Sequence, residues 1–338
     1  INLIMKIFIT GIAGFLGSNL AEHCLKKGMS VIGNDTLIGG NLKNIEDLKI
    51  EFHNTDCSDL EGMTKIMKDV DVVCHAAAFA HEGLSNVSPK LICENNVVGS
   101  VSVFTAAIRN NVKRIVYCSS MARYGSARVP YEENIEPKPV DPYGVSKVAA
   151  ESILKILSNT YKFEYNIAVP HNIVGPKQKY DDAFRNVASI MVNLILQNRS
   201  PIIYGDGEQK RCFSDIVDCI DSLDKLLFDP SITSEIVNIG PDEEQISINE
   251  LYKIISNKLQ FNKDPIYELD RPNEVREAIC SSEKARKILN YQTTISLEKS
   301  LDKIIEYVKV NGPKKFEYNY EIEIISEIAP RTWIKKLF

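Results

Sequence analysis

The feature that most restricts the fold is a short hydrophobic run that leads into a glycine-rich turn and then a helical pattern. Residues 5–10 form the run, Gly11, Gly14 and Gly17 follow at intervals of three, and residues 16–28 show helical periodicity that stops at a glycine. In a strand–turn–helix unit, such glycines let the backbone approach a pyrophosphate, and the helix N-terminus supplies free N–H groups. The pattern therefore predicts a dinucleotide-binding turn, although the spacing differs from Gly-x-Gly-x-x-Gly and glycines also simply make turns.

The second predicted strand carries a carboxylate at its end. This strand covers residues 30–34 and is followed by Asp35, roughly 20 residues beyond the glycines. A carboxylate there can accept hydrogen bonds from the adenosine ribose hydroxyls and repel a 2′-phosphate. Thr36 and Leu37 follow it in place of a basic residue, which also favours NAD over NADP. The alternative is that Asp35 is only a turn residue.

Strand and helix patterns continue to alternate through the first half of the chain. This alternation predicts an α/β fold with a doubly wound parallel sheet of the Rossmann type, and ligands at the carboxyl ends of its strands. Polar and small residues stand at these ends, namely Asp56, residues 75–78 and residues 119–120. The further strands are expected at 51–54, 70–75, 114–119 and 164–170, with helices at 60–68, 89–110 and 143–161.

The alternation becomes looser after residue 175. We therefore expect a cofactor-binding Rossmann domain at 1–175, a mainly substrate-binding, smaller C-terminal α/β lobe at 176–312, and a tail at 313–338. The tail is rich in Tyr, Ile and Glu and has few basic residues, so packing on the protein or a partner subunit is favoured over a membrane surface. Amphipathic helices are expected at 216–228, 248–259 and 297–310.

A tyrosine and a lysine in the first domain have the spacing of one helical turn. Tyr143 and Lys147 would lie one above the other on a helix that begins near Pro142. The lysine favours the phenolate, and the hydroxyl of Ser120 can hydrogen-bond the phenol or its substrate. Lowering the phenol pKa from about 10 to about 7 would represent ~4 kcal/mol and give a general base near neutral pH. Tyr-x-x-x-Lys alone is common, so chance spacing is the alternative.

The composition argues against several classes of partner. With 40 basic and 45 acidic residues among 338, the net charge is −5, which argues against a nucleic-acid surface. No apolar run reaches the length of a membrane span, and residues 1–10 suit a first buried strand better than a signal peptide. The eight cysteines are scattered without metal-ligand spacing, so we expect reduced cysteines, no metal and a cytoplasmic protein.

Seven motifs occur in a fixed order in the first half of the chain. They are Gly11/Gly14/Gly17, Asp35, Asp56, His75-Ala76-Ala77, Asn95-Asn96-Val97-x-Gly99, Ser119-Ser120-x-x-x-Tyr124-Gly125 and Tyr143-x-x-x-Lys147. Together they resemble the extended short-chain dehydrogenase/reductase family, and within it the NAD-dependent nucleotide-sugar epimerases and dehydratases of the UDP-galactose 4-epimerase type. The resemblance runs from about residue 5 to residue 305, and it implies that Tyr143 is the base, Lys147 holds the nicotinamide ribose and Ser120 assists at the sugar hydroxyl.

The resemblance also implies which residues contact each ligand. A homodimer is expected as well, because family members commonly dimerise through the two long helices that correspond to about 97–110 and 145–158. The residues implied for the nucleotide-sugar substrate are Ser120, Met121, Ala122, Asn172, Asn186, Arg211, Arg271 and Ala278. Those implied for the NAD cofactor are Gly11, Gly14, Phe15, Leu16, Gly17, Asp35, Asp56, Cys57, Ala76, Ala77, Ala78, Asn95, Ser119, Tyr143, Lys147 and Pro170.

The residues that follow Ser120 separate the branches of this family. Similar 4,6-dehydratases carry Asp-Glu there, and similar decarboxylases keep a Glu at the second position. Met121 and Ala122 cannot transfer a proton, which argues against both reactions. Epimerisation at C4 needs only one tyrosine that shuttles the proton while NAD takes and returns the hydride. The expected activity is therefore that of a nucleotide-sugar 4-epimerase acting through a 4-keto sugar.

Three positions in the second half bear on the substrate. Arg211 and Arg271 stand where the family keeps its diphosphate arginines, and guanidinium groups can grip a diphosphate bidentately, although loop arginines are often only solvated. Ala278 aligns with the position that gates the C2 substituent of the sugar. A small residue leaves room for an N-acetyl group, which favours UDP-N-acetylglucosamine and UDP-N-acetylgalactosamine, although alanine without a gating role remains open.

Three other functions stay open from the sequence. One is net oxidation or keto reduction at C4 of a nucleotide sugar. Another is a UDP-glucuronate 4-epimerase, for which no carboxylate-binding residue can be identified. The third is a dinucleotide-binding regulator without turnover, which the presence of Ser120, Tyr143 and Lys147 disfavours.

Overall fold

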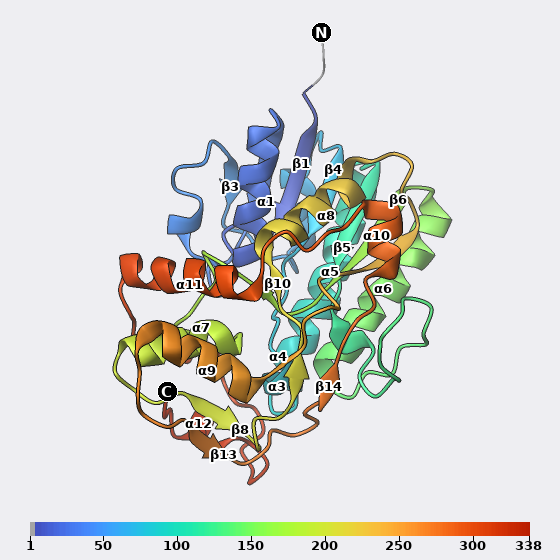
Figure 1. Ribbon diagram of the computed structural model, residues 1–338. Coiled ribbons are helices and arrows are strands. Elements are labelled where there is room, and N and C mark those ends of the chain that lie inside the picture. The colour runs from blue at the N-terminus through green and yellow to red at the C-terminus, as the bar shows by residue number, and fades with distance from the viewer. Residues whose placement is uncertain (1–3) are drawn as a thin grey trace.

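A seven-stranded parallel sheet forms the centre of the protein (Figure 1). In the computed structural model, which describes residues 4–338, its strands are β1 (Lys6–Thr10), β2 (Ser30–Asn34), β3 (Glu51–His53), β4 (Val72–His75), β5 (Arg114–Cys118), β6 (Glu164–Pro170) and β11 (Glu235–Ile239). Their order is β11-β6-β5-β4-β1-β2-β3. The winding reverses between β1 and β4, so the carboxyl ends of these strands border the crevice where doubly wound folds bind ligands. The Rossmann-type sheet predicted from the sequence is confirmed, while the prediction for residues 1–3 lies outside the described residues.

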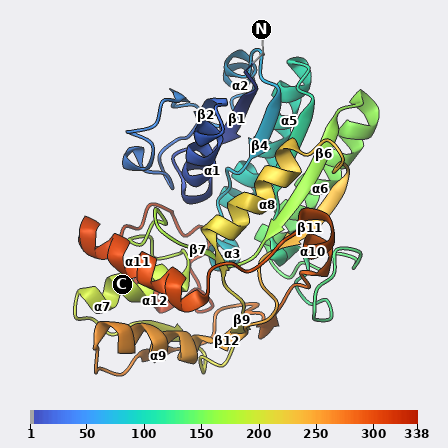
Figure 2. The ribbon, with the colours of Figure 1, turned by 45° about the horizontal axis from the view of Figure 1, so that its top comes forward.

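Helices cover both faces of the sheet (Figures 1 and 2). Because both faces are covered, the side chains that point to either face of the sheet are apolar and buried. In β1, Ile7 and Ile9 face one core and Phe8 faces the other. The first core lies under α1 (Phe15–Lys26), α8 (Ile216–Phe228) and α10 (Glu283–Leu289), and the second under α2 (Leu60–Ile66), α5 (Gly99–Arg109) and α6 (Pro142–Tyr161).

The helix predicted at 89–110 forms as Pro89–Arg109, but it contains one π-helical turn. It consists of α4 (Pro89–Cys93), a π-helical turn (Glu94–Val98) and α5. In the π-helical turn, the amide of Asn96 accepts a hydrogen bond from the N–H of Phe79 at 2.8 Å and donates to its carbonyl at 3.2 Å. These two bonds tie the turn to the loop after β4, so the π-helical turn lies with Asn95 and Asn96 beside the carboxyl edge of the sheet.

The same stretch is the one helix among the described residues that is long and apolar enough to cross a membrane, by length and composition only. Half of its most apolar window is buried inside the fold. Phe104 and Val103 of α5 belong to the core beneath α2 and α6, so packing against the sheet accounts for its apolar side chains.

The second half of the chain does not form a lobe by itself. Three of its elements, α8, β11 and α10, belong to the large sheet and its core. Part of the chain after the predicted boundary at residue 175 therefore lies in the first domain. The smaller lobe has its own core beneath α7 (Val187–Leu196), α9 (Ile248–Leu259) and α11 (Leu297–Asn311) (Figure 2). Three small sheets complete it: β7 (Ile173–Val174) with β10 (Ser214–Asp215), β8 (Ile202–Tyr204) with β13 (Ile266–Glu268), and β12 (Ile246–Ser247), β9 (Lys210–Arg211) and β14 (Glu277–Ala278).

All eight cysteines are free thiols, and six of them are buried, as the sequence predicts. Residues 313–338 also pack against the protein, and they end in the short helix α12 (Arg331–Ile334).

Candidate functional site

One cavity of about 490 Å³ lies along the carboxyl edge of the sheet and continues into the smaller lobe. Every residue that the sequence assigns to the cofactor or the substrate lines this cavity. They come from the ends of six parallel strands and from loops of the smaller lobe, so residues as distant in sequence as Gly11 and Ala278 share one space. The structure therefore brings the whole predicted set together.

The glycine-rich turn has the geometry that a pyrophosphate requires. Gly11 has a φ of +67°, and a Cβ at this position would lie 3.0 Å from the Cα of Ala77. A Cβ at Gly17 would lie 2.2 Å from the carbonyl oxygen of Gly11, so only glycine allows this packing of helix against turn. Gly14 precedes α1, and no side chain caps the free N–H groups of that helix. The turn thus fits the phosphates of a dinucleotide, which prefer such free N–H groups.

Asp35 holds the loop that follows β2. Its carboxylate accepts hydrogen bonds from the N–H of Ala13 at 3.1 Å and from the N–H of Leu37 at 2.7 Å. Burial raises the pKa of this carboxyl, while the backbone hydrogen bonds oppose that shift. The carboxylate oxygens still have acceptor capacity, so this geometry fits the hydroxyls of an adenosine ribose.

Tyr143 and Lys147 stand one turn apart at the start of α6. The side chain of Asp141 begins this helix by accepting the N–H of Gly144 at 2.7 Å. The Lys147 ammonium donates to the carbonyl of Cys118 at 2.9 Å and lies 5.7 Å from the centre of the Tyr143 ring. Burial lowers the pKa of Lys147 to about 8.

The pKa of Tyr143 differs from the lowered value considered from the sequence. Burial raises it well above the ordinary value of 10, the hydrogen bond with Ser120 lowers it, and Glu82 and Asp141 raise it further. The spacing to Lys147 alone therefore does not make Tyr143 a phenolate, because the phenol is buried beside two acidic residues and burial also lowers the pKa of Lys147.

A buried ion pair supports the loop that carries Ser119 and Ser120. Arg123 donates from Nε to the carboxylate of Glu151 at 3.0 Å, and both side chains are almost fully buried. The hydroxyl of Ser119 donates to the same carboxylate. Because Glu151 lies one turn beyond Lys147 on α6, this network fixes the serine loop relative to the helix that carries the tyrosine and the lysine.

The far end of the cavity holds two arginines on one carboxylate. Arg271 donates to Glu274 at 2.6 Å and 2.9 Å, and Arg211 donates to the same carboxylate at 3.0 Å. Burial raises the pKa of Glu274, but the two guanidinium groups outweigh this and bring it below its usual value. The Glu274 carboxylate thus lies between the two guanidinium groups, and a diphosphate is another anion that such a pair of arginines can bind.

Glu82, in the short helix α3 (Glu82–Ser85), lies between these two ends. It borders the cavity and is within electrostatic reach of Tyr143 on one side and of Arg211 and Arg271 on the other. Its side chain faces the cavity, but the protein surrounds it closely enough to weaken its hydration. This burial, followed by the negative charges of Asp141 and Glu274, raises the pKa of Glu82 to about 7.

The other predicted substrate residues lie around the same space. Met121 and Ala122 form a single turn (Met121–Arg123) that Ser120 begins, by accepting the N–H of Ala122 at 3.2 Å. Asn172 donates to the carbonyl of Cys212 at 2.8 Å, and Asn186 begins α7 by accepting the N–H of Ala188 at 3.0 Å. Ala278 pairs with Arg211 across β14 and β9 and is buried. The turn beside Ser120 therefore presents no acid or base at residues 121 and 122.

Several cavity residues were not identified from the sequence. Glu82 follows the strand-end alanines, and Glu274 comes three residues after Arg271, a spacing typical of a helical or turn ion pair that could have been noticed. Arg185, which precedes Asn186, also lines the cavity and pairs with Asp182 at 3.2 Å. The tail residues in the wall had no recognisable signal in the sequence.

The sequence matches the NAD-dependent epimerase/dehydratase family over residues 7–240, which is more than half of the chain. A relative from Methanocaldococcus jannaschii, named as a putative UDP-glucose 4-epimerase, is 34% identical over 309 residues, which cover 90% of this chain and 99% of the relative.

Two solved structures are similar over nearly their whole length. The UDP-glucose 4-epimerase of Thermotoga maritima with UDP-glucose has a TM-score of 0.85 and 27% identity, covering 91% of this chain and 99% of that chain. The UDP-N-acetylglucosamine 4-epimerase of Methanobrevibacter ruminantium, in complex with UDP-N-acetylmuramic acid, has a TM-score of 0.84 and 26% identity, with the same coverage of 91% and 99%.

Proposed function

This chain belongs to the NAD-dependent epimerase/dehydratase family, and we propose that within it the protein is a UDP-sugar 4-epimerase. NAD is the cofactor of the family. The observation that carries the proposal is the arrangement of the cavity: Tyr143 and Lys147 at one end, the paired arginines at the other, and no second acid or base at residues 121 and 122. The activities named for the similar proteins support the same reaction.

In the proposed mechanism, Tyr143 is the general base and acid at the sugar 4-hydroxyl. Its phenolate accepts the hydroxyl proton when the 4-keto sugar forms and returns the proton when the opposite epimer forms. When bound, NAD supplies the hydride acceptor and donor and, in its oxidised form, a positive charge that favours a nearby phenolate. Lys147, held by the Cys118 carbonyl at 2.9 Å, keeps an ammonium one turn from the phenol, and Ser120 orients the phenol or the sugar hydroxyl.

The proposed cofactor contacts follow the cavity wall. The N–H groups before α1 would hold the pyrophosphate, and Asp35 would accept hydrogen bonds from the adenosine ribose. The remaining predicted residues of this half, from Asp56 and Cys57 through Ala76–Ala78, Asn95 and Ser119 to Pro170, line the space between these groups and Tyr143.

Arg211 and Arg271 are the proposed diphosphate ligands. In the structure, both donate to Glu274. A bound diphosphate offers the same kind of planar, anionic acceptor and would compete with Glu274 for their N–H groups. A sugar attached to this diphosphate would then extend past Glu82 toward Tyr143.

The walls around the proposed sugar position favour an uncharged hexose. Glu82 and Asp141 lie near Tyr143, and like charges disfavour a second carboxylate in such a site. This weighs against UDP-glucuronate as substrate. Ala278 leaves space beside Arg211, which supports the preference for UDP-N-acetylglucosamine and UDP-N-acetylgalactosamine over UDP-glucose.

A cytoplasmic homodimer remains part of the proposal. On α6, Val145 and Ile156 have exposed fractions of 51% and 65%, and Val98, before α5, has 52%. These exposed apolar side chains support an interface on the two predicted helices. Phe104, on α5, is fully buried in the core and does not contribute to this surface.

The test of the proposed function is incubation of the purified protein with UDP-N-acetylglucosamine and with UDP-glucose separately, without added cofactor, followed by NMR of the products. We expect the galacto epimer from both, with a faster reaction of the N-acetylated substrate, and an epimerisation rate lower by orders of magnitude in the Tyr143→Phe variant. Reduction of bound NAD without epimer would indicate net oxidation of the sugar instead.

A further inference from the structure

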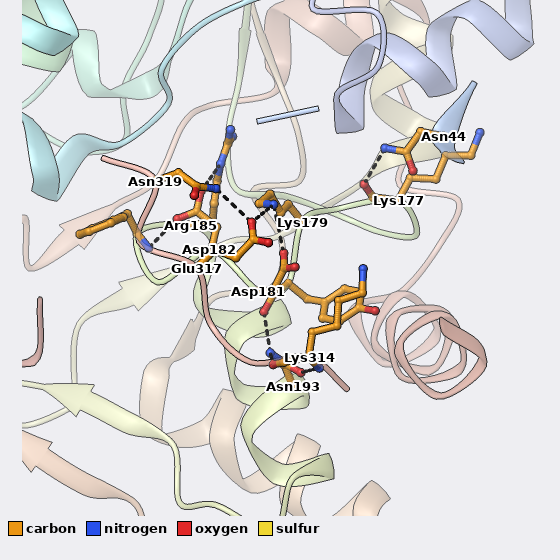
Figure 3. A network of polar contacts seen from close by, with 12 residues as sticks. Asn44, Lys177, Lys179, Asp181, Asp182, Arg185, Asn193, Lys314, Glu317 and Asn319 are labelled. Carbon is orange, nitrogen blue, oxygen red and sulfur yellow. Dashed lines mark hydrogen bonds and ion pairs between the residues drawn. The ribbon is translucent and has the colours of Figure 1, made fainter. Parts of the chain in front are cut away.

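The C-terminal segment, residues 313–338, is fixed to the smaller lobe at its beginning (Figure 3). The N–H of Lys314 donates to the Asn193 side chain at 2.9 Å, and that side chain donates back to the carbonyl of Lys314 at 2.9 Å. Glu317 then pairs with Lys179 at 2.8 Å. Figure 3 shows Lys314, Glu317 and Asn319 along the face formed by α7 and the loop before it.

The middle of the segment crosses to the half of the chain that carries the glycine-rich turn. The N–H of Ile324 donates to the carbonyl of Val87 at 2.9 Å. The carboxylate of Glu323 accepts the N–H groups of Lys90 at 3.0 Å and Leu91 at 2.9 Å, which are free donors at the start of α4. The segment thus bridges the two sides of the cavity.

Its last turn, α12, is attached beside the arginine end of the cavity. Arg331 makes a two-point ion pair with Glu268 of β13, at 2.6 Å and 2.8 Å. The hydroxyl groups of Thr332 and Tyr204 are 2.6 Å apart. These contacts hold α12 against β8 and β13.

Trp333, in α12, is 3% exposed and lines the cavity. Its ring packs edge-on against Tyr204, with the ring centres 6.3 Å apart. Tyr204 also contacts Arg271, whose guanidinium lies 5.2 Å from the centre of the tyrosine ring. A Cβ added at Gly83 would lie 3.0 Å from Trp333 and 3.4 Å from Arg271, so both side chains meet at this one backbone position. Trp333 therefore lies at the end of the cavity where the diphosphate is proposed to bind.

From these contacts we infer that residues 313–338 form the wall of the substrate site at its nucleotide end, and that Trp333 contacts the bound nucleoside diphosphate and positions the Tyr204–Arg271 pair. This inference rests on the proposed function. A planar indole next to a guanidinium suits the flat, partly apolar surface of a nucleoside together with its phosphates. The similar proteins described above are matched over 99% of their length but cover only 90–91% of this chain, so about a tenth of this chain has no counterpart in them.

The sequence contains a single tryptophan, so the fluorescence of the full-length protein reports on Trp333 alone. We would titrate the purified protein, with its retained NAD, with UDP, following tryptophan emission and, in parallel, heat by calorimetry. We expect a saturable change of emission with the same Kd as calorimetry. The Trp333→Ala variant should bind UDP about tenfold more weakly, with unchanged NAD content, and Trp333→Phe should recover most of the affinity. Ile325→Ala, in the same segment but 78% exposed, is the matched control and should bind UDP as the wild type does.

Each outcome has a definite consequence. If UDP binds by calorimetry while Trp333 emission does not change, the contact with the nucleotide is wrong and the proposed function stands. An equal Kd for Trp333→Ala and the wild type would also overturn the inference. If neither UDP nor UDP-N-acetylglucosamine binds to the wild type, the proposed function itself fails. A loss of UDP affinity accompanied by loss of NAD and of thermal stability would mean that Trp333 has only a structural role.

Discussion

The Lys147 ammonium lies 5.7 Å from the centre of the Tyr143 ring and donates to the carbonyl of Cys118 at 2.9 Å. The helix that carries both residues is tied to the sheet by this bond, so the distance between phenol and ammonium is fixed before any ligand binds. The phenol nevertheless keeps a raised pKa, because burial outweighs the hydrogen bond from Ser120. Activation of Tyr143 is therefore expected to depend on the bound cofactor as well as on Lys147.

Replacing Tyr143 by Phe is expected to lower kcat by about 10²–10⁴-fold, because the variant has no group to exchange the proton of the sugar 4-hydroxyl. The ring remains, so folding and bound NAD should be preserved. The measurement is epimer formation by NMR together with the melting temperature. Tyr161→Phe is the control, since Tyr161 is on the same helix but has an exposed fraction of 58%. Near-normal activity of Tyr143→Phe would remove this residue from the mechanism.

Lys147 predicts a specific dependence of stability on pH. Its pKa is about 8 in the folded protein against an ordinary value of 10.5. Between these values the folded state binds fewer protons than the unfolded state, so stability rises with pH through this window, and below pH 8 the full cost of the buried charge is present. We compare the free energy of unfolding of the wild type with that of the Lys147→Met variant, both stripped of NAD. Between pH 8 and pH 10.5, the wild-type value should rise by about 3 kcal/mol relative to that of the variant.

Urea unfolding of both proteins at several pH values in this window measures the difference. A difference that stays constant with pH would mean that Lys147 keeps an ordinary pKa despite its burial.

The exposed apolar residues on α6 predict a homodimer. A dimer of this 38.0 kDa chain should be observed by light scattering after gel filtration. Ile156→Glu should shift the protein toward the monomer, because it places a charge in an apolar interface. Val310→Glu is the matched control, since Val310 is 74% exposed on α11, away from both helices. If wild type and Ile156→Glu have the same mass, this face is not the interface.

The positions of the strands and of most site residues could be predicted because they depend on local patterns. In a parallel sheet the residue that follows each strand must lie at one edge, so Asp35, Asp56 and Ser119 meet there without further information. The spacing of Tyr143 and Lys147 likewise fixes one helical face. The π-helical turn near Asn96 was not predicted, because two side-chain bonds to Phe79 accompany it and no periodicity marks it.

Other properties depend on contacts between distant loops. The clamp of two arginines on Glu274, the place of Glu82 between Tyr143 and those arginines, and the return of Trp333 to the cavity all depend on tertiary packing. The direction of the pKa shift of Tyr143 has the same origin, since the spacing to Lys147 indicates the attraction but not the burial that opposes it.

Ala278 predicts the choice of sugar. Replacing it by Tyr should lower kcat/KM for UDP-N-acetylglucosamine about tenfold or more while affecting UDP-glucose much less, because the larger side chain would occupy the space beside Arg211. Ala278→Ser, which is almost isosteric, should change neither value strongly. An equal loss for both substrates in Ala278→Tyr would show that the residue affects packing of the site and does not select the C2 substituent.

Glu82 predicts how the protein treats an acidic sugar as pH changes. With a pKa of about 7, this carboxyl is mostly neutral at pH 6 and mostly ionised at pH 8. A uronate carboxylate is ionised at both, so repulsion should be present at pH 8 and largely absent at pH 6. The affinity for UDP-glucuronate should therefore rise several-fold as pH falls from 8 to 6, while the affinity for UDP-glucose changes little. Inhibition constants against the epimerase reaction measure both.

Glu82→Gln should remove this difference, because the amide carries no charge at either pH, and it should bind UDP-glucuronate at pH 8 about as well as the wild type does at pH 6. Glu46→Gln, an exposed glutamate outside the cavity, is the matched control and should retain the pH dependence of the wild type. If UDP-glucuronate binds the wild type equally at both pH values and Glu82→Gln changes nothing, Glu82 does not face the sugar. The exclusion of uronates would then rest on Asp141 alone, and UDP-glucuronate would return as a substrate to be tested directly.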